Sequence, residues 1–338
     1  MFVYGPSQIP PAACPDLDRE QVRRATICDP RRMDFTLARR WVAATRPGFL
    51  VVTLLGVLLG SAVGMACGGP GDWIGGAAAL LLALLTHAAI NLHNDWGDAQ
   101  IGSDAINTGR IGPFSGGSRV VQDGIFSVEQ LRDAVQMLGV IVIGGGILLT
   151  ARVGPGLLPI GLAGLVIGYA YSHPRLALMS RGVGDVAVAL SWWLVVLGAD
   201  YVQRRQFDVM PAIAGVSLAL MVAGILWVAE FPDAAADAQA GKRTLVVRLG
   251  PLPSAWVYLL LVVVAHAWVA WWWAIEWLPT SAWWALGSAP LSAAAAASLL
   301  RHARQPQRLR PTLVLTLAAT VLHGMLLIAA YVAVVRLR

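Results

Sequence analysis

The stretch LLLALLTHAAINLHNDWGDAQIGSD, residues 80–104, joins an apolar run to a group of carboxylates. Residues 80–90 have the composition of a membrane-spanning helix, and Asp95, Asp98 and Asp104 follow at its end. Removing a charge from water is costly unless that charge is paired. A group of like charges at the end of an apolar helix therefore predicts that a cation binds there.

The composition of the whole chain is typical of a membrane protein. Of its 338 residues, 57% are hydrophobic and 13% are charged, and the mean hydropathy is +0.65. Soluble proteins carry about 25% charged residues, and a helix needs about 20 apolar residues to cross a bilayer. We therefore predict an all-α polytopic membrane protein with about nine transmembrane helices in one bundle. The predicted spans are residues 46–67, 74–94, 129–151, 156–173, 185–203, 209–229, 254–275, 281–300 and 312–335.

The ends of these spans differ in charge, which predicts their orientation. Residues 1–40 are rich in proline and arginine and are expected to form a poorly ordered cytoplasmic extension before a domain at 41–338. Cytoplasmic segments of membrane proteins carry an excess of lysine and arginine. Five of the 25 such residues fall on the outer side, which leaves 20 on the inner side: the outer ones are Arg152, Arg204, Arg205, Arg336 and Arg338. We therefore expect a cytoplasmic (inner) membrane protein with its N-terminus in the cytoplasm. The net charge of +6 is then an orientation signal, and no nucleic-acid partner is expected.

A second acidic cluster lies in EFPDAAADAQAGKRTLVVRLG, residues 230–250. Asp233 and Asp237 are four residues apart, as are Asn94 and Asp98 in the first cluster, so each pair shares one face of a helix. The predicted topology puts both clusters on the cytoplasmic side. Carboxylate and amide oxygens, with few protein ligands for each ion, suit magnesium. The sequence therefore predicts a magnesium site between the two clusters.

Basic residues follow each acidic cluster. Lys242 is the only lysine in the chain and comes five residues after Asp237, while Arg119 follows a Gly-Gly-Ser turn at 116–118. Backbone amides of such turns and basic side chains bind phosphate oxygens. Acids for a metal and bases for phosphate, at a membrane surface, point to a diphosphate substrate with a lipid tail. We expect the tail to run into the helix bundle.

These residues resemble the UbiA superfamily of intramembrane aromatic prenyltransferases. Asn94-Asp95-x-x-Asp98 is similar to the start of the first motif of that family, and Asp233-x-x-x-Asp237 is similar to the second. Tyr171 and Arg175 resemble its YxxxK motif, with arginine in place of lysine. The shifted Asp104 and the GKRTLVVRLG segment resemble the menaquinone-pathway branch, which prenylates 1,4-dihydroxy-2-naphthoate.

The resemblance implies a cleft among nine helices that opens sideways to lipid, and Mg²⁺-dependent transfer of a polyprenyl group from polyprenyl diphosphate to a small aromatic acceptor. It implies two magnesium ions bound with the diphosphate, and no obligate protein partner. The implied metal ligands are Asn94, Asp95, Asp98 and Asp104 for one ion and Asp233 and Asp237 for the other. The implied diphosphate contacts are Asn94, Arg46, Arg119 and Lys242. The implied catalytic residues are Asp95, Asp98, Asp233, Asp237, Tyr171 and Arg175, of which Tyr171 and Arg175 are expected near the reacting carbon and the acceptor.

The acceptor and the class of function have alternatives at this point. Residues 229–232 read Ala-Glu-Phe-Pro, where the menaquinone-pathway branch usually has asparagines and an arginine. The acceptor is therefore left open: 1,4-dihydroxy-2-naphthoate is favoured, and the alternatives are 4-hydroxybenzoate, homogentisate, a chlorin, haem and a phosphosugar or glycerol compound. A divalent-cation transporter would also place acids in membrane helices. It would not be expected to crowd those acids with lysine and arginine.

Overall fold

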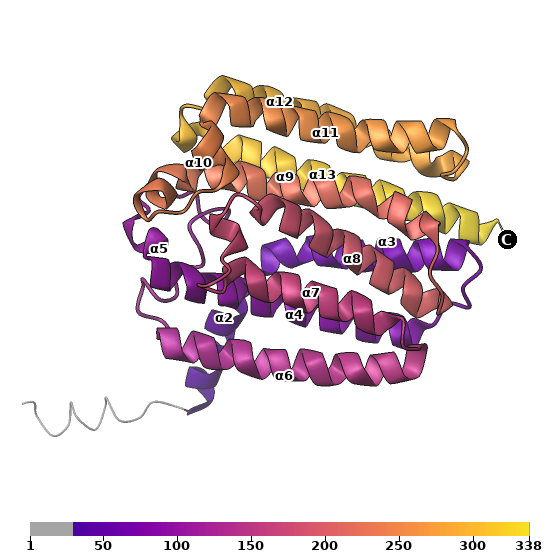
Figure 1. Cartoon of the computed structure of the whole chain (residues 1–338), viewed down its shortest axis with the longest axis horizontal. Coiled ribbons are helices and arrows are strands. Elements are labelled where there is room, and N and C mark those ends of the chain that lie inside the picture. The colour runs from indigo at the N-terminus through magenta and orange to yellow at the C-terminus, as the bar shows by residue number, and fades with distance from the viewer. Residues whose placement is uncertain (1–29, 338) are drawn as a thin grey trace, which may run out of the picture. The chain divides into compact units, whose positions relative to one another are not determined.

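The structure, a computed structural model, describes residues 30–337, and every regular element within them is a helix (Figure 1). Most of the predicted N-terminal extension, residues 1–29, lies outside the described residues. The long helices are α2 (Pro30–Ala44), α3 (Leu50–Ala66), α4 (Trp73–Ile101), α6 (Val128–Val153), α7 (Leu157–Ser172), α8 (Gly184–Arg204), α9 (Val209–Gln239), α11 (Pro251–Ala274), α12 (Ala289–His302) and α13 (Arg310–Arg336). The short helices are η1 (Pro47–Phe49), α5 (Ser103–Ile106), η2 (Leu178–Ser180), α10 (Leu245–Leu249), η3 (Thr280–Ser288) and η4 (Pro306–Arg308).

The membrane spans agree with the prediction in number and order. Within the described residues, eight helical segments are long and apolar enough to cross a membrane, and the ninth predicted span is the 16-residue helix α7. Two helices run further than expected: α4 continues to Ile101 and α9 to Gln239. Asp95 and Asp98 therefore lie on the last turns of α4, and Asp233 and Asp237 on the last turns of α9, while Asp104 lies on the short helix α5.

Local sequence signals explain several of the helix boundaries. The Asp72 side chain accepts a hydrogen bond of 2.8 Å from the Gly75 amide and so caps the start of α4. Gly102 ends α4 with a φ of 84°, a left-handed conformation that glycine adopts without strain. Ser127 and Gln130 form a reciprocal capping box at the start of α6.

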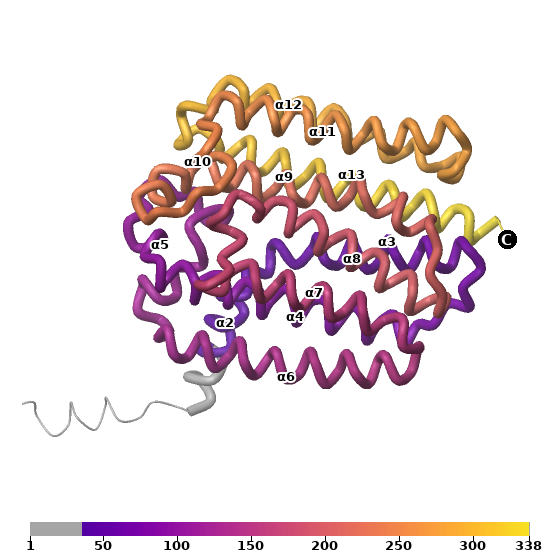
Figure 2. The backbone as a smooth tube through the Cα atoms, in the orientation of Figure 1, coloured from indigo at the N-terminus to yellow at the C-terminus, as the bar shows by residue number. Residues whose placement is uncertain are grey.

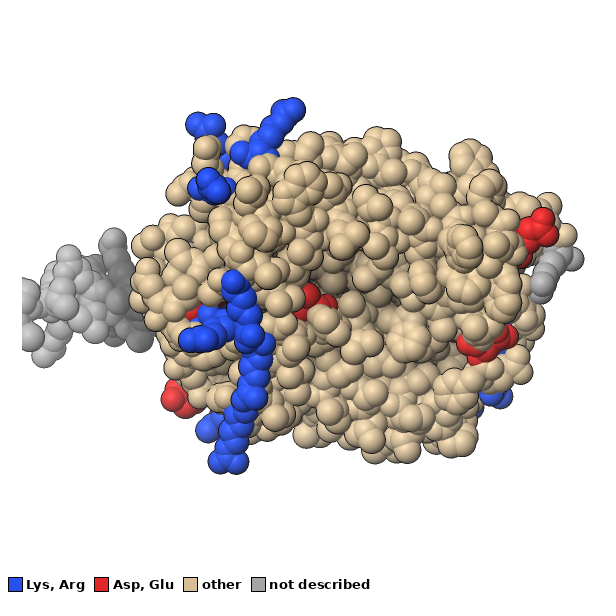
Figure 3. Space-filling model, turned by 45° about the horizontal axis from the view of Figure 1, so that its top comes forward, with Lys and Arg blue, Asp and Glu red and all other residues tan. Residues whose placement is uncertain are grey.

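Residues Val42–Arg338 form one compact unit in which the long helices from α3 to α13 run side by side (Figure 1). Helices α3, α8, α9 and α13 supply most of one buried apolar cluster, and α9, α11, α12 and α13 supply most of a second. Helix α6 packs against α4 and α7, and much of its surface is exposed, as at Val140 and Leu148. Lipid tails are the natural partners of such a surface. Figure 3 shows that the middle of one face carries almost no charge, while lysine and arginine gather toward the end where Figure 1 shows α5 and α10.

The closest helix contact involves glycines that the sequence analysis did not single out. Gly56, Gly60 and Gly64 recur every four residues along α3 and face α8. A Cβ atom at Gly60 would lie only 2.2 Å from the carbonyl oxygen of Val196. Small residues at this spacing let membrane helices approach closely. Of the three glycines at 144–146, Gly144 and Gly146 do not mediate a close helix contact, because a Cβ at either position would meet no atom within 4 Å.

This contact predicts opposite outcomes for two Gly→Ala substitutions. Gly60→Ala places a methyl group against the α8 backbone, which cannot rotate away, so we expect a loss of stability of about 1–3 kcal/mol. Gly144→Ala enters open space and gains helix propensity, so it should leave stability unchanged or raise it. Thermal unfolding of the two purified variants in the same detergent measures the difference. Equal unfolding temperatures would contradict the packing described here.

Candidate active site

The two acidic motifs meet at one end of the helix bundle, where α4 and α9 both finish and where α5 and α10 lie (Figure 2). Because α4 and α9 remain helical through the motifs, residues three or four apart share a face. Asp98 and Asp237 are both buried there, at 5% exposure each. The pairing of the two clusters that the sequence predicted is therefore present in the folded chain.

Lys242 connects the two motifs directly. Its Nζ lies 2.9 Å from Oδ1 of Asp98 on α4 and 3.1 Å from Oδ1 of Asp237 on α9. Burial lowers the pKa of Lys242, but the Asp98 and Asp237 carboxylates raise it by more, so this pKa lies above its ordinary value. The only lysine of the chain is thus a buried cation held between two acidic helices.

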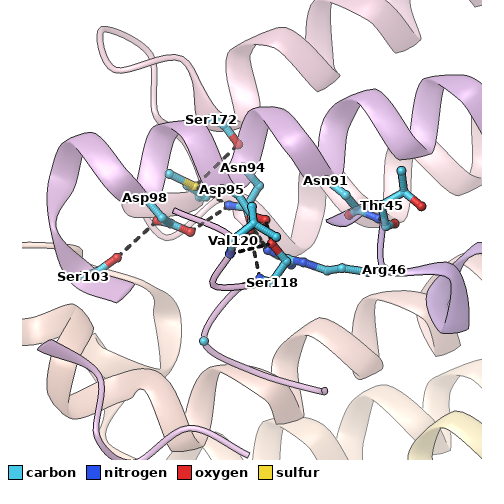
Figure 4. A network of polar contacts seen from close by, with 12 residues as sticks. Thr45, Arg46, Asn91, Asn94, Asp95, Asp98, Ser103, Ser118, Val120 and Ser172 are labelled. Atoms are coloured by element: carbon cyan, nitrogen blue, oxygen red, sulfur yellow. Dashed lines mark hydrogen bonds and ion pairs between the residues drawn. The ribbon is translucent and has the colours of Figure 1, made fainter. Parts of the chain in front are cut away.

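Arg46 contacts the first motif from the loop before α3. Its Nη2 lies 3.2 Å from Oδ1 of Asn94 and forms an ion pair with Asp95 (Figure 4). Asp95 also accepts hydrogen bonds from the hydroxyl and the amide of Ser118. Asn94 in turn donates to Asp98 at 3.0 Å. The first motif is therefore neutralised by Arg46 on one side and by Lys242 on the other.

The loop between α5 and α6 closes over both motifs. The Asn107 side chain donates to Asp233 at 2.6 Å, and the Gly116 amide donates to the other oxygen of Asp233 at 2.9 Å. Gly117 has a φ of 68°, and a Cβ there would lie 2.2 Å from Oδ2 of Asp104. Only glycine fits at this close approach. Asn107 is a site residue that the sequence analysis missed. The Gly-Gly-Ser turn at 116–118 was predicted to bind phosphate, and in the folded chain the amides of Gly116 and Ser118 donate to Asp233 and Asp95.

Asp104 is buried without a partner for one of its oxygens. Its side chain is 6% exposed, and its Oδ2 forms no hydrogen bond. Burial, followed by the nearby Asp98 carboxylate, raises the pKa of Asp104 to about 7. A buried carboxyl oxygen without a donor is expected to gain one when a ligand binds.

Two cavities meet beside these motifs. The larger one has a volume of about 580 Å³, is lined mainly by apolar side chains of the spans, and reaches exposed side chains such as Ile147 and Leu162 on α6 and α7. The smaller one has a volume of about 90 Å³, and its charged lining includes Asp98, Asp104, Glu230, Asp233, Asp237 and Lys242, while Asp95 lines neither cavity. The residues that line both cavities are Arg46, Asn94, Phe114, Tyr171, Leu226 and Ala229.

Two residues predicted for the site lie elsewhere. Arg175 is exposed and lines neither cavity, because α7 ends at Ser172 and Pro174 prevents the helix from continuing. Tyr171 and Arg175 therefore do not share a helix face. Arg119 donates to the carbonyl oxygen of Asp104 at 3.1 Å and pairs with Asp123, and its side chain lines neither cavity.

The donor set suits a metal ion that shares its ligands with a phosphate. Within residues 30–337, no three histidine, cysteine, aspartate or glutamate side chains are close enough together to hold a metal ion. Magnesium usually takes one or two carboxylates and completes its shell with water and substrate phosphates. The buried carboxylates around the small cavity, and the free Oδ2 of Asp104, fit such a partial shell and do not form a closed protein cage.

Comparison with known proteins agrees with this architecture. Residues 49–317 match the model of the UbiA prenyltransferase family. The chain is 26% identical over 295 residues to a 1,4-dihydroxy-2-naphthoate octaprenyltransferase of Escherichia coli (strain K12), which covers 85% of this chain and 93% of that protein. It is 28% identical over 226 residues to a 2-carboxy-1,4-naphthoquinone phytyltransferase of Synechocystis, covering 66% and 70% respectively.

A solved structure gives the same result for the fold. A UbiA homologue from Archaeoglobus fulgidus, bound to DMAPP and Mg²⁺, superposes with a TM-score of 0.60 at 18% identity, covering 88% of this chain and 100% of the other. The family model spans most of the chain, and the relatives named above transfer prenyl or phytyl groups. The chain therefore belongs to the UbiA prenyltransferase family and is a prenyltransferase enzyme, as its two motifs predicted.

Proposed function

We propose that this enzyme transfers a polyprenyl group from polyprenyl diphosphate to an aromatic acceptor in a magnesium-dependent reaction, with 1,4-dihydroxy-2-naphthoate of menaquinone biosynthesis as the favoured acceptor. One observation carries the proposal: a large apolar cavity and a small charged cavity share the wall that contains Tyr171. A prenyl diphosphate has the same division, an apolar tail joined to a polyanionic head. Its reacting carbon links the two parts and would lie at the shared wall.

The tail of the substrate would occupy the larger cavity. Its walls come from membrane-spanning helices, and it reaches the lipid-facing side chains of α6 and α7. A long polyprenyl chain exceeds what a cavity of about 580 Å³ can enclose, so part of it would extend into the bilayer. Contact with apolar walls also keeps water away from the allylic cation, which water would otherwise capture.

The diphosphate would bind in the smaller cavity. We propose Asn94, Asp95, Asp98 and Asp104 as ligands of one magnesium ion, and Asp233 and Asp237 as ligands of a second. Bound magnesium would supply positive charge that stabilises the departing diphosphate. Lys242 and Arg46 already lie against the carboxylates, so they are placed to add charge-assisted contacts to phosphate oxygens. Preorganised charge of this kind is the largest single contribution in many enzymes.

The choice of acceptor and of membrane side rests on the relatives and on charge. Several of the relatives are named 1,4-dihydroxy-2-naphthoate octaprenyltransferases, which favours the menaquinone pathway over hydroxybenzoate, homogentisate, chlorin or haem. The excess of arginine at the end that carries the acidic motifs favours the cytoplasmic side of the inner membrane. A cation transporter is disfavoured because Lys242 and Arg46 are paired with the acids that would carry the ion.

The direct test is an assay of purified protein in nanodiscs with Mg²⁺, a labelled polyprenyl diphosphate and a panel of acceptors. We expect a prenylated product from dihydroxynaphthoate, identified by mass spectrometry, and none when EDTA is added. A product from another acceptor would support prenyl transfer but would assign the enzyme to a different pathway. No product from any acceptor, with folded protein and intact substrate, would contradict the proposal.

A second prediction concerns the metal ligands. Asp98→Asn and Asp237→Asn each remove one carboxylate charge, so the Mg²⁺ concentration that gives half-maximal rate should rise at least tenfold. Asp133→Asn is the control, because Asp133 is an exposed carboxylate that pairs with Arg132 on α6. Rates at a series of Mg²⁺ concentrations separate the variants. If Asp98→Asn and Asp133→Asn behave alike, the metal assignment is wrong.

A third prediction compares two adjacent cations. Lys242→Met removes the buried charge, and we expect kcat to fall about 10²- to 10³-fold, the usual loss of one electrostatic contact to a transition state. Arg243→Met alters the exposed neighbour and should retain most of the activity. Lys242→Arg keeps a charge and tests whether charge alone restores the rate. Circular dichroism of each variant checks folding, and unchanged kcat in folded Lys242→Met would exclude the role proposed for Lys242.

A further inference from the structure

Glu230 is a buried acid that the diphosphate and metal assignments leave without a role. It lies on α9, one turn before Asp233, and is 7% exposed. The Oε2 atom is buried and has no hydrogen-bond partner. One oxygen of this buried carboxyl group is therefore left free.

The position of Glu230 distinguishes it from the other acids of the site. Within the described residues, no lysine, arginine or histidine forms an ion pair with it, whereas Asp95, Asp98 and Asp237 each have such a partner. Glu230 lines the small cavity, and its helix neighbours Leu226 and Ala229 line both cavities. Glu230 thus belongs to the helix segment that forms part of the wall shared by the apolar and the charged cavity.

The chemistry of this position limits what can bind there. The cations near the small cavity, Arg46 and Lys242, pair with the aspartates and not with Glu230, so Glu230 is not the group that gathers positive charge for the head group of the substrate. An apolar tail would leave its free oxygen without a donor, which is unfavourable for a buried polar atom. A hydroxyl group can donate to this oxygen. The remaining reactant of a prenyl transfer is the acceptor, whose ring must reach the carbon where the two cavities meet.

Building on the proposed function, we propose that Glu230 binds the acceptor by accepting a hydrogen bond from a ring hydroxyl at Oε2. The ligand class is a hydroxylated aromatic ring. The ring would then lie beside the reacting carbon, at the wall that both cavities share.

The first test compares two acids on the same helix, Glu230 and Asp237. Glu230→Gln keeps the shape of the side chain. It replaces one carboxyl oxygen by an NH2 group, which donates hydrogen bonds, and leaves a neutral amide oxygen in place of the other. We expect the KM for the acceptor to rise about tenfold to a hundredfold, the usual effect of losing a hydrogen bond to a charged group. The KM for prenyl diphosphate and the Mg²⁺ requirement should stay within about twofold of the parent enzyme. Asp237→Asn should show the opposite pattern, with a raised Mg²⁺ requirement.

Two outcomes of this test would overturn the inference. A Glu230→Gln enzyme with an unchanged acceptor KM would show that the hydroxyl does not bind there. A raised Mg²⁺ requirement like that of Asp237→Asn would make Glu230 a metal ligand instead. Both outcomes leave prenyl transfer by the parent enzyme intact, so they are distinct from a failure of the proposed function, which is the absence of product with every acceptor.

A binding measurement tests the same point without turnover, and its first comparison needs only the parent protein. The parent protein in nanodiscs is titrated with 1,4-dihydroxy-2-naphthoate and with its dimethyl ether, which cannot donate the hydrogen bond. We expect the dihydroxy compound to bind about tenfold or more tightly than the ether, and Glu230→Gln to remove this preference. Equal affinities of the parent protein for the two compounds would overturn the inference.

Discussion

The ion pairs of Lys242 with Asp98 and Asp237 are the interaction on which the rest of the site depends. They join the ends of α4 and α9, whose motifs are 139 residues apart in the chain. Two buried carboxylates would repel each other without this cation, and removing one partner of a buried pair costs about 3–5 kcal/mol. The same charge is available to an anionic substrate. One buried lysine therefore both holds the folded site together and prepares it for a polyanion.

The helical spans and the pairing of the two acidic motifs could be predicted from the sequence, because both follow from local patterns. Apolar runs of about 20 residues mark spans, and acids four residues apart share a helix face. The predicted spans end at residues 94 and 229, where the charged residues begin, whereas the helices run on to Ile101 and Gln239. The helices continue because Arg46, Lys242 and the Asn107 loop pair with those charged turns, and hydropathy does not report such tertiary partners.

The parts of the site that could not be predicted depend on long-range geometry. Asn107 carries no motif signal, and only the path of the loop between α5 and α6 brings it to Asp233 and brings Ser118 to Asp95. Arg175 was expected near Tyr171 from the resemblance to a YxxxK motif, but α7 ends at Ser172. The α3 glycines at positions 56, 60 and 64 recur every four residues, and this spacing can be recognised in the sequence. Their partner helix, α8, is not evident from spacing alone.

The central claim is that the protein supplies only part of a magnesium site and that the diphosphate completes it. Calorimetric titration of Mg²⁺ into the purified protein in nanodiscs, with and without an unreactive thiolo analogue of a prenyl diphosphate, tests this most directly. The account predicts weak Mg²⁺ binding by the protein alone and binding at least tenfold tighter with the analogue present. Equal Mg²⁺ affinities in the two titrations would contradict it, because the protein alone would then provide the whole cation site, as a cation transporter does.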